Sequence, residues 1–444
     1  MPVATRRDVD ETTDVTPPRA ASPDAASTAP GAPGPRRHRP AEGSPWRPIS
    51  RAELEQRFLQ ADGADSAVEG VGATGATAPA EPSQRGPEVD LVFCMDCTGS
   101  MGSYIKSAKH GIEAIARKLI EVEGYDLRVG VVAYRDYDDM SSGEAYDVVT
   151  LPFTSQIEVM EKNLASLSAS DDPYGDGPEA VEEGLRGVAE MEWRDTPTKL
   201  CILIGDAPPH GLGEWHDDYP EGPPSGIDAL QVLDGLADKG VVVYALGCEP
   251  TLSASYSYGA DFWIAAAEKT SGRALALRSP SALSDIVIGV VVEEMDLESL
   301  RRGIHAWTDE VRRQHPNLDD EDVQDAVYRS LCATEPRPFR RLQISELTSA
   351  TAGLVAKAST LSEARLRLRA AKEPEGVCVD ATPSTAATYR GLSADDAAAA
   401  APAAAAAPAV PAIPALVPIT LCTGELTRTS FDRMYKRVAK QRGE

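Results

Sequence analysis

The sequence predicts an α/β fold: a doubly wound, mostly parallel sheet, followed by a C-terminal helical extension and flanked by disordered arms. Three observations predict it. Buried-strand patterns recur along the middle of the 444-residue chain, helical stripes of apolar residues lie between them, and acidic residues directly follow two of the strands. Strands that alternate with helices are typical of parallel sheets, because each parallel connection needs a crossover.

The expected elements follow one another in a regular order. The first strand pattern, 89–95, is followed by a helical stripe at three- and four-residue steps: Ile105, Ala108, Ile112, Ile115 and Leu119. Further strands are expected at 127–134, 147–153, 200–204, 241–246 and 274–277. Further helices are expected around 181–188, 227–236 and 281–295. This alternation is that of a doubly wound sheet.

The loop after the first strand carries the most chemistry. Asp96, Thr98 and Ser100 place one carboxylate and two hydroxyls at alternate positions of a short loop that leads into a helix. Oxygen ligands of this kind suit a hard divalent cation such as Mg²⁺, and the first N–H groups of the helix lie beside them. The same residues also fit a plain strand–turn–helix in which Ser100 or Ser103 caps the helix.

A second strand pattern also ends in an acid. Residues 200–205 lead into Asp206, and an acid- and glycine-rich loop, 171–180, precedes that strand. Ligands of open α/β sheets bind at the carboxyl ends of the strands, near the point where the strand order reverses. We therefore expect Asp96, Asp206 and the acidic loop to converge there.

Taken together, these segments resemble the von Willebrand factor A family. The resemblance rests on residues 96–101, 128–136, 175–181, 204–211 and 291–297, and it covers roughly residues 88–297. It is closest to the intracellular subgroup found beside atypical alpha-kinases. The resemblance implies a metal-ion-dependent adhesion site and an antiparallel edge strand at 147–153.

The resemblance also implies a ligand set. Asp96, Thr98 and Ser100 would hold Mg²⁺ (or Mn²⁺ or Ca²⁺), with Asp206 reaching the ion through water. Many family members have a metal-contacting threonine in the middle loop, where this chain has Gly175 or Asp176, and Asp176 is the candidate for the missing oxygen. An exposed Asp or Glu of an unidentified protein partner would fill the open position, as in an adhesion or scaffold module.

Residues shortly after Asp206 are candidates for a partner-binding rim. His210 and Trp215 lie in a long insertion with a Pro- and Gly-rich end, and an exposed aromatic side chain can anchor a partner. The tryptophan could equally pack the loop down. A zinc site would need tighter, recurring His and Cys spacing than this stretch has.

The enzymatic alternative is a haloacid-dehalogenase-like phosphohydrolase with Asp96 as its nucleophile. The loop 96–100 is similar to the Asp-x-Thr-Gly-Thr loop of that family, and Asp206 is similar to part of its metal motif. That motif needs an acid or amide four residues on, where this chain has His210, and no lysine stands in an obvious position to steady a phosphate. A kinase would need a glycine-rich nucleotide loop that the sequence lacks. We therefore expect a binding module and no enzyme.

Composition restricts the partners and the compartment. The chain has 44 basic and 69 acidic residues, a net charge of −25, which argues against nucleic-acid binding. Seven scattered cysteines are typical of free thiols in a reducing, cytoplasmic setting. We find no secretory signal and no run apolar enough for a membrane span.

Outside the core domain, 87–297, the chain is divided into four parts. We expect a disordered arm at 1–86 with a short helix near 51–60, a helical extension at 298–373 and an Ala/Pro-rich linker at 374–420. Residues 421–444 predict a basic amphipathic helix with Phe431, Met434, Tyr435 and Val438 on one face. Such a helix can contact a partner, acidic lipid or the protein's own acidic surface, and the interpretation we favour is a frayed, solvated tail.

Overall fold

The computed structural model describes residues 86–137, 148–169, 177–195, 198–334, 338–372 and 419–443. The predicted arm with its helix near 51–60 lies outside the described residues, as do Gly175, Asp176 and nearly all of the predicted linker.

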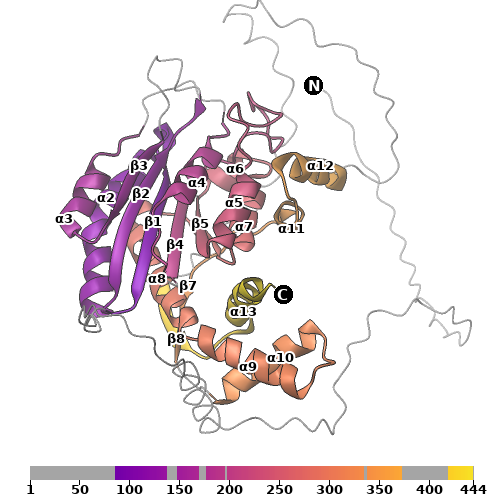
Figure 1. The fold of residues 1–444 in the computed structure, drawn as a ribbon. Helices are drawn as coiled ribbons and strands as arrows, with labels where there is room; N and C mark the ends of the chain where they lie inside the picture. The colour runs from indigo at the N-terminus through magenta and orange to yellow at the C-terminus, as the bar shows by residue number, and fades with distance from the viewer. Residues whose placement is uncertain are drawn as a thin grey trace, which may run out of the picture. The chain divides into compact units, whose positions relative to one another are not determined.

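A six-stranded sheet forms the centre of the fold (Figure 1). Its strands are β1 (Glu88–Asp96), β2 (Asp126–Tyr134), β3 (Val149–Thr154), β4 (Thr198–Gly205), β5 (Val241–Cys248) and β6 (Ala274–Leu277). They lie in the order β3-β2-β1-β4-β5-β6, and all neighbours are parallel except the antiparallel pair β2 and β3. The predicted doubly wound sheet is confirmed, and β3 is its antiparallel edge.

Helices cover both faces of this sheet (Figure 1). One face packs against α2 (Gly102–Arg117), α3 (Ile157–Ala165) and α8 (Leu283–Glu298), and the other against α4 (Val181–Glu190), α5 (Ala229–Asp238) and α7 (Gly259–Lys269). Shorter helical segments are Gly99–Met101, the π-helical turn Lys118–Val122, α6 (Thr251–Ser255) and Pro280–Ala282. The predicted stripe from Ile105 to Leu119 is buried along α2 and the turn after it. Periodicity alone therefore located the helix that follows the acidic loop.

The C-terminal part contains α9 (Arg301–Gln314), α10 (Asp320–Thr334), α11 (Ala352–Ala356), α12 (Leu361–Lys372) and α13 (Arg428–Arg442). Helices α9, α10 and α13 share a third apolar core, whereas α11 and α12 pack into the core on the α7 face of the sheet. Among the described residues, no helix is long and apolar enough to cross a membrane.

The extension is not purely helical, which corrects the sequence prediction. Strand β7 (Phe339–Gln343) pairs antiparallel with β8 (Thr420–Gly424) in a separate two-stranded sheet. Each strand is five residues long. Strands this short give little periodicity, and the pairing joins segments on opposite sides of the predicted linker.

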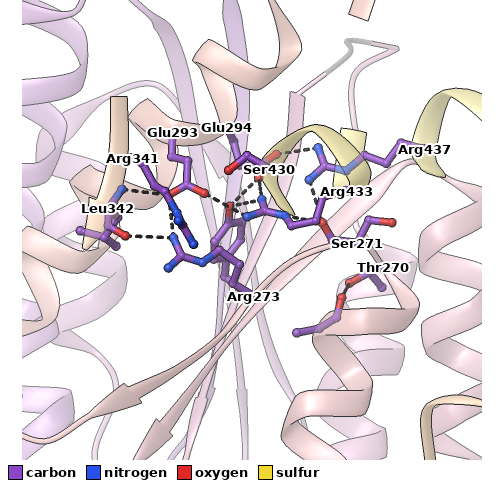
Figure 2. A network of polar contacts seen from close by, with 12 residues as sticks. Thr270, Ser271, Arg273, Glu293, Glu294, Arg341, Leu342, Ser430, Arg433 and Arg437 are labelled. Carbon is purple, nitrogen blue, oxygen red and sulfur yellow. Dashed lines mark hydrogen bonds and ion pairs between the residues drawn. The ribbon is translucent and has the colours of Figure 1, made fainter. Parts of the chain in front are cut away.

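The prediction of a solvated C-terminal tail is wrong. Helix α13 buries Phe431, Met434, Tyr435 and Val438 in the third core. Its basic residues bind the protein's own acids (Figure 2): the Arg433 and Arg437 guanidinium groups pair with Glu293 and Glu294 of α8. Among the alternatives that the sequence left open, contact with its own acidic surface is the one that the structure contains.

Candidate functional site

Three neighbouring strands end at one edge of the sheet and carry acidic residues there. Strand β1 lies between β2 and β4, so its last residue, Asp96, stands beside the ends of both. Asp136 follows β2 after one intervening residue, and Asp206 directly follows β4. After β1 the chain continues into α2 on one face of the sheet, whereas α4, the helix that precedes β4, lies on the other face. The winding therefore reverses between β1 and β4, and ligands of open α/β sheets bind at the carboxyl ends of such strands.

Asp96 organises the loop that follows β1. Its Oδ1 atom accepts hydrogen bonds from the Thr98 backbone N–H at 2.8 Å and from the Thr98 hydroxyl at 2.7 Å. The backbone at Gly205 passes so close that an added Cβ would lie 3.2 Å from the Asp96 Cβ. A glycine at the end of β4 therefore lets the two acidic loops approach each other.

A chain of hydroxyls connects Asp96 with Asp206. The Thr98 and Ser100 hydroxyl oxygens are 3.4 Å apart, and the Ser100 hydroxyl donates to Asp206 Oδ1 at 3.0 Å. The structure thus brings Asp96, Thr98, Ser100 and Asp206 together. The helix-cap interpretation of Ser100 fails, because its hydroxyl bonds across to Asp206 and the cap position of α2 is Met101.

Acidic side chains are concentrated beneath the surface of the site. Asp96 is fully buried and Asp206 nearly so, whereas Ser100 is exposed. Burial, together with the charge of Asp206, raises the pKa of Asp96 to about 7, and burial raises the pKa of Asp206 as well. Asp96 Oδ2 has no hydrogen-bond partner among the described residues. A buried carboxylate oxygen without a donor is costly, and a cation at this point would satisfy it.

These residues fit a hard divalent cation through a mixed donor set. Two carboxylates and two hydroxyls provide the oxygen chemistry that Mg²⁺ and Ca²⁺ prefer. Within the part of the chain that the structure describes, no three His, Cys, Asp or Glu side chains form a metal-binding group. The predicted set is of a different kind, because two of its members are hydroxyls.

Two further acids lie at this edge, and the sequence analysis did not assign them to the site. Burial and the charges of Asp96, Asp136 and Asp206 raise the pKa of Glu179 well above its ordinary value. Glu179 Oε2 and Asp136 Oδ2 are both buried without a hydrogen-bond partner among the described residues. Asp136 carries the same signal as Asp96, an acid at a strand end, and could have been found.

His210 lies beneath the rim and not on it. Its side chain is fully buried, with Nε2 2.8 Å from Asp136 Oδ1 and Nδ1 2.9 Å from Asp217 Oδ1. Carboxylates accept hydrogen bonds, so both ring nitrogens donate and the imidazole is cationic. Burial opposes this charge, but the two aspartates outweigh it and raise the pKa of His210 to about 10. His210 therefore braces the loop and cannot touch a partner directly.

Trp215 is the exposed aromatic residue of the same loop. It is 81% exposed and stands edge-on to His216, with ring centroids 4.9 Å apart. The alternative that it packs the loop down does not fit this exposure. The loop itself is anchored below Trp215, since Asp217 Oδ2 accepts from the Gly211 N–H at 2.7 Å.

Comparison with known proteins identifies the domain. The model of the von Willebrand factor type A domain matches residues 90–287. The chain is 32% identical over 160 residues to the alpha-protein kinase vwkA of Dictyostelium discoideum, and 26% identical over 199 residues to an ariadne-like RING finger protein of Acanthamoeba polyphaga mimivirus. The first match covers 35% of this chain and the second 43%; they span 24% and 18% of those relatives.

A solved structure is similar to part of the chain. The von Willebrand factor type A protein from Catenulispora acidiphila is 13% identical, with a TM-score of 0.33, over 48% of this chain and 43% of that chain. The family match itself begins in β1 and ends in α8, and so spans all six strands of the central sheet. Residues 90–287 of this chain are therefore a von Willebrand factor type A domain.

Proposed function

We propose that this chain is a metal-dependent protein-binding module, in which a divalent cation at the end of β1 captures an Asp or Glu side chain of a partner protein. One observation carries the proposal. A chain of hydrogen-bonding contacts joins Asp96, Thr98, Ser100 and Asp206, and Asp96 Oδ2 is buried at its inner end without a partner among the described residues.

The cation we propose is Mg²⁺, with Mn²⁺ or Ca²⁺ as alternatives. Asp96, Thr98 and Ser100 would hold it, and Asp206 would assist through water. The bound ion would supply an open coordination position, since a site with few protein ligands leaves places for water or a ligand. The hydroxyls of Thr98 and Ser100 now donate to the two carboxylates, so their lone pairs remain available to an ion.

The approach to the ion is from the side of Ser100. Gly99 and Ser100 are exposed, whereas Asp96 and Thr98 are buried behind them. The chain has a net charge of −25, so a bound cation would be a local positive charge that attracts an acidic side chain. Trp215 would add an apolar anchor at the rim.

The enzymatic alternative uses the same residues differently. A phosphohydrolase with Asp96 as nucleophile stays a prediction, and none of the similarities reported above supports it. The relative vwkA is named an alpha-protein kinase, but the match spans 24% of its length. We propose binding without catalysis, because Asp96, Thr98 and Ser100 provide oxygen ligands for a cation and the exposed Trp215 provides a contact for a partner protein.

A metal-dependent capture experiment tests this function. Full-length protein on beads is exposed to a protein mixture in Mg²⁺ and in chelator, beside the variants Asp96→Ala and Trp215→Ala. We expect a protein that is retained by the wild type in Mg²⁺ and lost both with chelator and with Asp96→Ala. A protein that is retained equally in chelator and by Asp96→Ala would contradict the proposal. Phosphatase turnover that Asp96→Asn removes would favour the alternative.

A further inference from the structure

We propose that Glu179 is a further ligand of the divalent cation, in the position of the middle loop for which the sequence offered Asp176. This inference rests on the proposed metal site, and it assigns the residue that completes it.

The backbone at Glu179 crosses the end of β1. The Glu179 N–H donates to the Pro208 carbonyl at 2.9 Å, and the Ala180 N–H donates to the Arg135 carbonyl at 3.1 Å. Pro208 follows β4 and Arg135 follows β2, the two strands on either side of β1. The segment is therefore fastened to both neighbours, over the point where β1 ends in Asp96.

The approach to this crossing is fixed as well. Gly177 has a φ of +125°, a conformation that side-chain-bearing residues rarely adopt, and its carbonyl accepts from the Tyr256 hydroxyl at 2.6 Å. Pro178, with its restricted φ, is buried between Gly177 and Glu179. Rigid backbone on both sides holds the Glu179 side chain in one place, as a metal ligand requires.

The Glu179 side chain is influenced electrostatically by the predicted ligands. Burial and the charges of Asp96, Asp136 and Asp206 raise the pKa of its carboxyl group, and a hydrogen bond with Thr98 acts in the opposite direction. Oε2 is buried and accepts no hydrogen bond from any described residue. Asp96 Oδ2 is likewise buried without a hydrogen-bond partner among the described residues. Two buried carboxylate oxygens without donors, beside two hydroxyls, form the ligand set of a hard cation.

A purely structural role for Glu179 makes a different prediction. An acid just before α4 could simply favour the positive end of that helix. That role needs a negative charge near the helix and no particular oxygen position. A ligand needs the oxygen at a defined place, so shortening the side chain separates the two roles.

Calorimetric titration of the full-length chain with MgCl₂ and MnCl₂ tests the inference. The variants are Glu179→Gln, Glu179→Asp, Asp96→Asn and the control Glu182→Gln. Glu182 lies on α4, is fully buried and also has an oxygen without a partner among the described residues, but its other oxygen accepts a hydrogen bond from the Tyr137 hydroxyl at 2.8 Å. We expect both Glu179 variants to bind the ion about 10- to 100-fold more weakly, and Glu182→Gln to bind like the wild type.

The outcomes separate this inference from the proposed function. Thermal unfolding with and without Mg²⁺ gives a second readout. The ion should raise the unfolding temperature of Glu182→Gln, and it should raise the unfolding temperature of either Glu179 variant much less. If Asp96→Asn loses the ion while both Glu179 variants keep wild-type affinity, Glu179 is no ligand and the metal site stands. If the wild type binds neither ion, both claims are overturned.

Discussion

The Ser100 hydroxyl donates a 3.0 Å hydrogen bond to Asp206 Oδ1, which joins two loops that are 106 residues apart in the chain. Ser100 is exposed and Asp206 is 5% exposed, so this bond connects the surface with the buried acids behind it. Under the proposed function, a ligand that reaches Ser100 would lie next to the buried carboxylates.

Replacing Asp96 with Asn should remove divalent-cation binding and leave the fold intact. The Asn side chain can still accept the two hydrogen bonds from Thr98 at its carbonyl oxygen, whereas the charge that attracts the ion is gone. We expect Mg²⁺ affinity to fall by roughly 100-fold, measured by calorimetry. In chelator the variant should unfold at no lower temperature than the wild type, since a buried carboxylate has been neutralised. Unchanged affinity would discard the site.

The buried pair of His210 and Asp136 makes stability depend on pH. The pKa of His210 rises from about 6.5 in the unfolded chain to about 10 in the fold, because Asp136 and Asp217 outweigh the opposing effect of burial. Its stabilising effect is therefore fully present below pH 6.5 and is lost as the pH rises toward 10. We expect the urea midpoint, measured in chelator, to fall between pH 7 and pH 9, and to fall less in His210→Gln.

Glu182 is the control for that experiment. Burial raises the pKa of Glu182 to about 8, so its protonated form also stabilises the fold at low pH and loses this effect as the pH rises through 8. In Glu182→Gln, the urea midpoint should therefore fall less steeply with pH below pH 8 than it does in the wild type. Above pH 8 it should fall as steeply as in the wild type. Equal slopes in the wild type and His210→Gln would contradict the assignment of a buried imidazolium.

The sequence located the central sheet and one half of the site. Asp96 ends one continuous apolar run and Asp206 directly follows another. Strands buried on both faces have such runs, so the residues at their carboxyl ends can be recognised in the sequence. Asp136 had the same signal. Glu179 did not, because its role depends on the backbone crossing from Pro208 to Arg135 over β1. No periodicity records such a crossing.

The C-terminal helix shows a different limit. Its apolar face and its basic residues were both visible in the sequence, but their partners were not. Glu293 and Glu294 lie in a helix that the sequence placed correctly, some 140 residues before Arg433. Long-range ion pairs leave no local pattern, and a run of basic residues is more often solvated. The pairing of His210 with Asp136, 74 residues away in the chain, escaped prediction for the same reason.

Two helical glycines should respond in opposite directions to alanine. A Cβ at Gly184 of α4 would lie 2.4 Å from Tyr134 Cδ1 and 3.0 Å from Cys94 Sγ, so Gly184→Ala forces α4 away from the sheet. At Gly235 of α5 nothing lies within 4 Å. We expect Gly184→Ala to destabilise the fold by about 1–3 kcal/mol, and Gly235→Ala to stabilise it by about 0.5–1 kcal/mol. Chemical denaturation measures both, and changes of the same sign would contradict this packing.

The ion pairs of α13 make the last prediction (Figure 2). The Arg433 guanidinium bonds to Glu293 Oε1 at 2.9 Å and to the Tyr244 hydroxyl at 2.6 Å, and it also pairs with Glu294. Arg433→Met would leave buried acids short of positive charge, and removing one partner of a buried pair costs about 3–5 kcal/mol. Arg273 still pairs with Glu293, and Arg437 with Glu294, so we expect the lower end of that range.

Lys436, on the exposed side of the same helix, is the matched control for Arg433. Lys436→Met removes the same charge from the same element, and we expect a change within about 0.5 kcal/mol. Urea denaturation of the full-length chain compares the two variants, and limited proteolysis shows whether α13 has come loose. If Arg433→Met were as stable as Lys436→Met, the buried pairs would contribute nothing to docking, and the apolar face around Phe431 would hold the helix alone. If α13 were cleaved early in Arg433→Met and late in Lys436→Met, the guanidinium would be what fastens the end of the chain to α8.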